Sequence, residues 1–134
     1  MAEDIGGEIK SVLALAPVAA SSAQNGLGID KTGFRSATCV IANGAATGSP
    51  TSYTVDAKIQ QSSDDGSTDA YADVSGLTMT QITVDNKVGE INFDLTGLKK
   101  YVRVVVTPAL TGGTSPKALI GAVMILGNPQ YLPQ

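Results

Sequence analysis

Short apolar runs separated by turn-forming residues dominate the pattern of hydrophobic and polar positions along this 134-residue chain. In residues 51–62 apolar and polar side chains alternate with a period of two, which is typical of a half-buried β-strand. The apolar positions of this segment are Tyr53, Val55, Ala57 and Ile59. Residues 99–110 show the same alternation, with Val102, Val104 and Val106 on one face, and Pro108 is expected to end the strand or to place it at an edge.

Other segments follow similar patterns. Strands are predicted over residues 8–17, 34–43, 88–97 and 117–127, with one or two short strands within 73–85. Because the turn GAATGSP joins residues 34–43 to 51–62, these two segments are predicted to form a hairpin. A slip in the alternation predicts a bulge at Gly89–Glu90. Residues 19–33 are predicted to be a loop, anchored by Leu27 and Ile29.

Two of the predicted strands have apolar side chains on both faces. Residues 34–43 do not alternate cleanly, which favours burial on both faces over burial on one. Residues 117–127, KALIGAVMILG, are long enough for a helix, but Gly121 interrupts the run and its neighbours are strands. A buried strand is therefore predicted there.

These patterns predict an all-β fold in a single domain. No segment has a sustained helical stripe, and turn residues recur at roughly ten- to fifteen-residue intervals, as in sandwiches and barrels. We expect an antiparallel β-sandwich over residues 1–134, with a jelly roll as one candidate form. Residues 1–7 and 128–134 are expected to be extended arms.

The composition narrows the range of functions. Hydrophobic residues make up 43% of the chain and charged residues 16%, and the chain has no histidine. Serine–histidine catalysis, common zinc ligand sets and the usual near-neutral general base are therefore excluded. Serine–lysine or carboxylate chemistry is not excluded by this argument, but no enzyme and no cofactor are expected.

Nucleic acids and membranes are not expected partners. The net charge is −3 and the nine basic residues are scattered, which is a poor electrostatic footprint for nucleic acid. The apolar run at residues 11–20 is short, is interrupted by Pro17 and follows an acidic start, so it fits neither a transmembrane span nor a signal peptide. Cys39, the single cysteine, is predicted to be a buried structural thiol.

The stretch SSDDGSTDAYAD concentrates four carboxylates, Asp64, Asp65, Asp69 and Asp73, around Gly66. It does not match a helix–loop–helix calcium motif, because Ala72 stands where that motif needs glutamate. An irregular calcium site and a catalytic carboxylate pair are weaker alternatives to a solvated connection between strands.

Candidate interface residues come from two places. Lys99, Lys100 and Arg103 could contact an acidic partner, although such charges more often begin a strand and protect its edge. In the terminal segments, apolar residues could reach a neighbouring chain by strand addition. These terminal residues are Ile5, Ile9, Tyr131 and Leu132.

Three stretches carry a resemblance to a known family: GFRSATCVIANG, the Q-x-S-x-D-G element with one additional Asp at Gln60–Gly66, and KKYVRVVVTPALTGGTSPKALIGAVMILGNPQYLP. Over roughly residues 33–133 the chain resembles small virion proteins of tailed bacteriophages and prophages. Several members of this group are head decoration, or cement, proteins.

The resemblance implies a β-rich protein, made in the host cytoplasm, that binds the outer surface of the mature capsid. The implied partners are the major capsid protein and further copies of the chain, with a trimer favoured. A tail tube, tail-tip or fibre component is the main alternative. A carbohydrate-binding sandwich ranks lower, because tryptophan is absent and Tyr71 is the only tyrosine in an obvious loop.

Overall fold

A computed structural model describes residues 9–129, which form nine strands and no helix within that range. The strands are β1 (Lys10–Ala20), β2 (Gln24–Asn25), β3 (Ile29–Asp30), β4 (Phe34–Asn43), β5 (Ser52–Ser62), β6 (Ala72–Thr78), β7 (Lys87–Asp94), β8 (Tyr101–Thr111) and β9 (Ala118–Pro129). All strand pairs are antiparallel. The predicted all-β class is confirmed.

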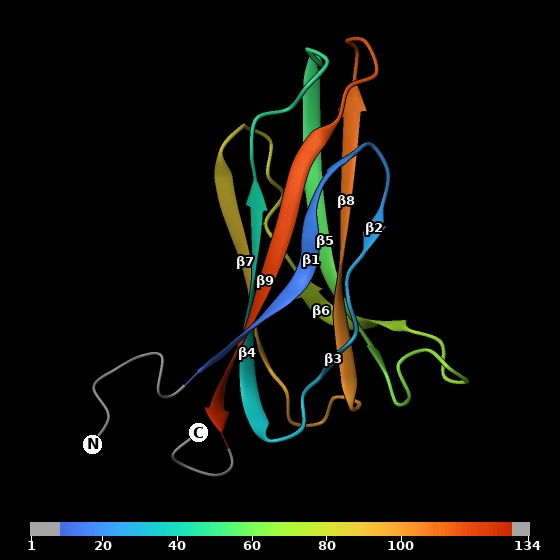
Figure 1. Ribbon diagram of the computed structural model, residues 1–134, viewed down its shortest axis with the longest axis vertical. Coiled ribbons are helices and arrows are strands. Elements are labelled where there is room, and N and C mark those ends of the chain that lie inside the picture. Colours follow the sequence, from blue (N-terminus) through green and yellow to red (C-terminus); the bar gives the residue numbers. More distant parts are fainter. Residues whose placement is uncertain (1–8, 130–134) are drawn as a thin grey trace.

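The strands form two sheets that pack face to face (Figure 1). Sheet A has the order β1-β9-β4-β7, and sheet B has the order β2-β8-β5-β6, with β3 also pairing with β8. Counting β2 and β3 as two pieces of one strand, the first half of the chain pairs with the second half in reverse order: β1 with β9, β2 and β3 with β8, β4 with β7, and β5 with β6. This arrangement is a jelly roll, the candidate form that the sequence suggested.

Alternation along the strands supplies the core between the sheets. β8 contributes Val102, Val104 and Val106, all fully buried, and these are the residues predicted from the sequence. The inward residues of the partner strand β5 are also buried, namely Tyr53, Val55, Ala57 and Ile59. From sheet A the largest contributions are Cys39, Ile41, Ile91, Phe93, Met124 and Leu126.

The predicted hairpin between residues 34–43 and 51–62 is wrong. β4 lies in sheet A and β5 lies in sheet B, so the connection between them crosses from one sheet to the other. Thr47 still pairs with Lys117 beside β9, and the crossing follows at Gly48 and Ser49, which both have positive φ. The alternation correctly predicted which residues of β5 point inward, but it contains no information about which strand pairs with which.

The predicted bulge at Gly89–Glu90 is also wrong. The β4–β7 register runs without a shift from Ser36↔Asp94 to Asn43↔Lys87. Gly89 faces inward, where a Cβ would overlap the sulfur of Met79, and Val88 faces outward. The apparent slip in the sequence therefore comes from a glycine that makes room for a neighbouring side chain.

Several element boundaries differ from the prediction. Ile29 is buried and anchors the segment 19–33, as expected. Leu27 is 54% exposed, so the prediction that it is an anchor is wrong. Asn128 and Pro129 belong to β9 and not to an arm. β1 continues past Pro17 to Ala20, because β1 is an edge strand with an irregular register, where a missing N–H is tolerated.

Pro108 likewise lies inside β8 and does not end it. It pairs with Val55, whose backbone N–H and carbonyl both bond to Ile82 on the other side of β5. The proline nitrogen therefore points away from β5, on the side of β8 that β2 no longer covers at this position. The prediction that proline marks an edge holds for this part of the strand.

Candidate functional site

The outward side of sheet A is apolar and almost free of charge. Val123, in the middle of β9, lies between Leu13 of β1 and Val40 of β4. The next row places Gly121 beside Ala42 and Val88. We call this surface the sheet A outer face, and its principal residues are Leu13, Pro17, Ala19, Val40, Ala42, Val88, Leu119, Gly121, Val123 and Ile125.

The exposure of these side chains sets the surface apart. Among residues 9–129, four of the six exposed large hydrophobic side chains lie on the sheet A outer face. These four are Leu13, Val88, Leu119 and Val123, each 40–60% exposed. No charged residue occurs in the segments 11–20, 36–43 and 118–127. Contiguous apolar surface of this kind marks an interaction site more often than a free surface.

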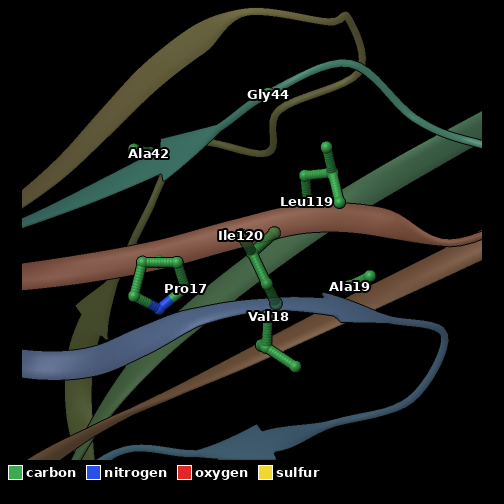
Figure 2. A pocket seen from close by; sticks show the side chains of 8 residues that line it. Pro17, Val18, Ala19, Ala42, Gly44, Leu119 and Ile120 are labelled. Carbon is green, nitrogen blue, oxygen red and sulfur yellow. The ribbon is translucent and has the colours of Figure 1, made fainter.

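One end of the sheet A outer face is hollowed. A shallow depression of about 380 Å³ lies there, between β1, β9 and β4, because Ala42, Gly44 and Gly121 carry little or no side chain. Figure 2 shows Leu119 rising from β9 toward Gly44 and Pro17 lying on β1 beside β9. The lining is apolar, so the depression suits an apolar side chain and offers no group for catalysis.

The outward side of sheet B carries polar and charged side chains that contact one another. Arg103 of β8 donates from Nε to Gln60 Oε1 at 2.9 Å, and its guanidinium lies 4.2 Å from the centre of the Tyr71 ring. Lys58 of β5 forms an ion pair with Asp73 at 3.0 Å. We call this surface the sheet B outer face. Lys58, Gln60, Arg103 and Asp73 on this face therefore have partners within the chain.

The acidic stretch is the connection between β5 and β6, and its carboxylates organise their own loop. Asp64 accepts hydrogen bonds from the backbone N–H of Thr68 and Asp69 and from the Thr68 hydroxyl. These bonds, led by the one from the Thr68 hydroxyl, lower the pKa of Asp64 to about 2. Asp65 and Gly66 adopt positive φ at the tip of the loop.

The other carboxylates of the loop also have partners in the chain. Asp69 accepts from Lys99 Nζ at 2.9 Å, and that bond is the main cause that lowers the pKa of Asp69. Asp65 accepts from the Tyr71 hydroxyl at 2.6 Å, and together they lie against Gly28, where a Cβ would collide with both. Residues 9–129 contain no group of three or more potential metal-ligating side chains. The arrangement is that of a structured connection between strands.

A buried polar link joins the two sheets at one end. Asn43 of β4 donates to the Tyr53 hydroxyl and to the Val84 carbonyl, both at 2.9 Å. Tyr53 in turn donates to Asp85, which also accepts from the backbone N–H of Ala46. These bonds lower the pKa of Asp85, and burial is the main cause that raises the pKa of Tyr53. The link fastens two connecting segments and leaves no free nucleophile.

Cys39 is fully buried in the core, as predicted. Burial raises the pKa of its thiol to about 12, so the reactive thiolate is not formed near neutral pH. In the described part of the chain, no helix has the length and apolar character needed to cross a membrane.

The structure describes four of the seven predicted interface residues, namely Ile9, Lys99, Lys100 and Arg103. Ile5, Tyr131 and Leu132 lie outside the described residues. Ile9 is half-buried over Gly127, at the end of sheet A. Lys99 and Arg103 have the partners described above, and Lys100 lies 4.0 Å from Asp30 and 5.5 Å from the Tyr101 ring centre. Arg103 lies in β8 of sheet B, Lys99 and Lys100 lie in the connection that leads into β8, and all three have partners within their own chain.

The sequence reasoning missed the sheet A outer face as a site, although its signal was present. Residues 34–43 and 117–127 are apolar at both alternating sets of positions, which was interpreted as burial on both faces. The structure buries the inward set of β4, whereas the outward set is half-buried or, at Ala42, exposed. On β9 the outward residues Leu119 and Val123 are each 40% exposed. The signal in the sequence was a strand with apolar residues at both alternating sets of positions, because the chain can cover one set and leave the other exposed.

Comparisons with known proteins identify no family. No family model matches the chain, and no curated protein matches it. Among solved structures, the fold is similar to that of the SPBc2 prophage-derived protein YomS, with 19% sequence identity and a TM-score of 0.49. The alignment covers 90% of this chain and 94% of that one. A similarity at this level assigns no function to the chain.

Proposed function

We propose that this chain is a non-enzymatic structural protein of a tailed-phage virion. In the specific form of the proposal, it is a head decoration protein that binds the outer surface of the mature capsid and stabilises it. The observation that carries the proposal is a jelly roll with a broad, apolar and nearly uncharged outer face, which suits assembly with other chains. Jelly rolls are found in viral capsid proteins as well as in lectins, so this part of the support is a fold-level analogy.

The chemistry of the described residues supports a binding role over a catalytic one. The carboxylates of the acidic stretch bond to groups of their own loop, to Lys99 or, for Asp73, to Lys58 and Gln60, and the single thiol is buried. The depression on the sheet A outer face is lined by apolar residues. The chain therefore offers surface for assembly, and the resemblance of its sequence to small virion proteins gives the class of assembly.

Binding only to the mature lattice would stabilise that lattice by mass action. A decoration protein of this kind adds buried area at junctions between neighbouring capsid subunits and changes no covalent bond. The partners in this proposal are the major capsid protein and further copies of the chain.

The test is co-sedimentation of the purified chain with undecorated, expanded heads of the phage that encodes it. Unexpanded proheads are the matched control. We expect saturable binding to expanded heads only, together with a higher temperature of DNA release. Absence of binding to both head forms would overturn the decoration role and favour a tail component, which tube or fibre formation by the purified chain would support.

A further inference from the structure

We propose that the sheet A outer face is a self-association surface, on which two copies of this chain stack face to face about a twofold axis. The inference goes beyond the virion assignment and does not depend on it. Its basis is the size, the charge and the shape of the face.

The size of the face meets the requirement of a stable pair. The face consists of four strands, of which three are 10–12 residues long and β7 has 8 residues. With strands about 4.8 Å apart and a rise of about 3.3 Å per residue, the face measures roughly 19 by 30 Å, or roughly 600 Å². Two stacked faces would bury about 1,200 Å² in total, which exceeds the roughly 1,000 Å² expected of a biological interface.

The charge distribution favours a second copy over a charged partner. Among residues 9–129, the register places two charged side chains on this side of the sheet, Glu90 and Asp94, and both lie on β7, at the margin of the sheet. These two carboxylates are exposed and can stay in solvent at the rim, so a stacked copy can cover Val123 and Leu13 at the centre of the face without desolvating an unpaired charge. A second copy offers a face of the same size and the same lack of charge, as an isologous interface requires.

The shape of the face also suits close stacking. Most side chains at the centre of the face are short, namely those of Val123, Val40, Gly121 and Ala42. Two sheets can therefore approach to the usual face-to-face distance of about 10 Å. The depression between β1, β9 and β4 can receive an apolar side chain such as Leu119 from the other copy. Sheet B, with its internally bonded polar groups, would remain in solvent on both sides of the pair.

The first test measures the mass of the full chain by sedimentation equilibrium over a range of concentrations. We expect twice the mass of one chain. Val123→Lys places a charge at the centre of the face and is expected to weaken association by roughly thirtyfold or more, since an uncompensated buried charge costs at least about 2 kcal/mol. Because Val123 is 40% exposed in the single chain, the variant should still fold, which circular dichroism would verify.

The matched control is Thr107→Lys, the same charge on an exposed residue of the sheet B outer face. It should leave the mass unchanged. A mass of one chain, a mass of three chains, or a pair that Val123→Lys leaves intact would overturn the proposal. The three-chain result would favour the trimer that the family resemblance implies.

A second test uses cysteine cross-linking and does not depend on the effect of a charge. The one native cysteine, Cys39, is buried, so an added surface cysteine reacts alone. Val123→Cys should be cross-linked into pairs by a short bifunctional maleimide, and Thr107→Cys should not. Equal yields for the two variants would contradict the face-to-face arrangement.

Discussion

The two outer faces of the sandwich contain a matched pair of valines. Val105 lies on β8, an inner strand of sheet B, and Val123 lies on β9, an inner strand of sheet A, and both point outward. Val105 is 5% exposed and Val123 is 40% exposed. The neighbours of Val105 include Lys58, whose long aliphatic chain can cover it, whereas Val123 is flanked by Leu13 and Val40.

The difference shows that an outward valine is shielded from water on sheet B and is left partly exposed on sheet A. On sheet B, long polar side chains stand beside the apolar group and contact one another: Arg103 donates to Gln60 and stacks on the Tyr71 ring. On sheet A, short side chains leave the apolar groups open. The sandwich therefore has one outer face whose apolar groups are covered within the chain and, on its opposite side, one whose apolar groups another molecule can cover.

The largest expected effect comes from shortening the two valines. Val105→Ala should lower the free energy of unfolding by about 2 kcal/mol, because two buried methyl groups are lost and a small cavity forms. Val123→Ala should cost less than about 1 kcal/mol at high dilution, because its methyl groups are partly solvated. Urea denaturation of both variants checks the comparison.

The loss of strand propensity is the same for both valine substitutions, so the difference between them reports burial. Raising the protein concentration should increase the cost of Val123→Ala if that face is covered by a second copy. Equal costs at all concentrations would remove the distinction between the two faces.

A smaller effect is expected for Arg103→Ala on the sheet B outer face. The variant loses the contact with the Tyr71 ring and the bond to Gln60, which together should lower the free energy of unfolding by about 1 kcal/mol. Arg103→Lys should restore only part of the loss, because lysine lacks the planar group that stacks on the ring. Thermal unfolding of the two variants measures their stabilities. If Arg103→Lys were as stable as the unmodified chain, the positive charge alone, and not the planar group, would account for the contribution of Arg103.

The smallest expected effect concerns acid. The pKa of Asp64 is lowered in the folded chain, so its bonds to the loop contribute stability above the pKa of the unfolded state, near 4, and this contribution is lost as the pH falls toward about 2. Asp64→Asn should therefore flatten the decline in melting temperature between roughly pH 4 and pH 2.

The control for the acid prediction is Asp56→Asn, which changes an exposed carboxylate of the same sheet that the loop does not use. It removes one carboxylate without touching the loop, and its slope is the reference for the slope of Asp64→Asn. An unchanged slope in Asp64→Asn would mean that the loop bonds do not stabilise the fold.

The sequence by itself determined the strands and their inward residues. Alternation at Val102, Val104 and Val106, and at Tyr53 to Ile59, depends only on the two-residue period of a strand, so local pattern was sufficient. It also predicted that Cys39 is buried and that the acidic stretch connects two strands. The partners of each strand were not local information, which is why the predicted hairpin between residues 34–43 and 51–62 was wrong.

Only the tertiary structure decided which apolar positions remain open. The segment KALIGAVMILG is apolar throughout, and its pattern cannot say whether the chain covers one face or both. The jelly-roll order settles this point, because it packs sheet B against the inward side of β9 and leaves Leu119 and Val123 exposed on the other side. The same order separates Lys99, Lys100 and Arg103 from Ile9, since strand pairing across the whole chain, and not sequence spacing, sets those distances.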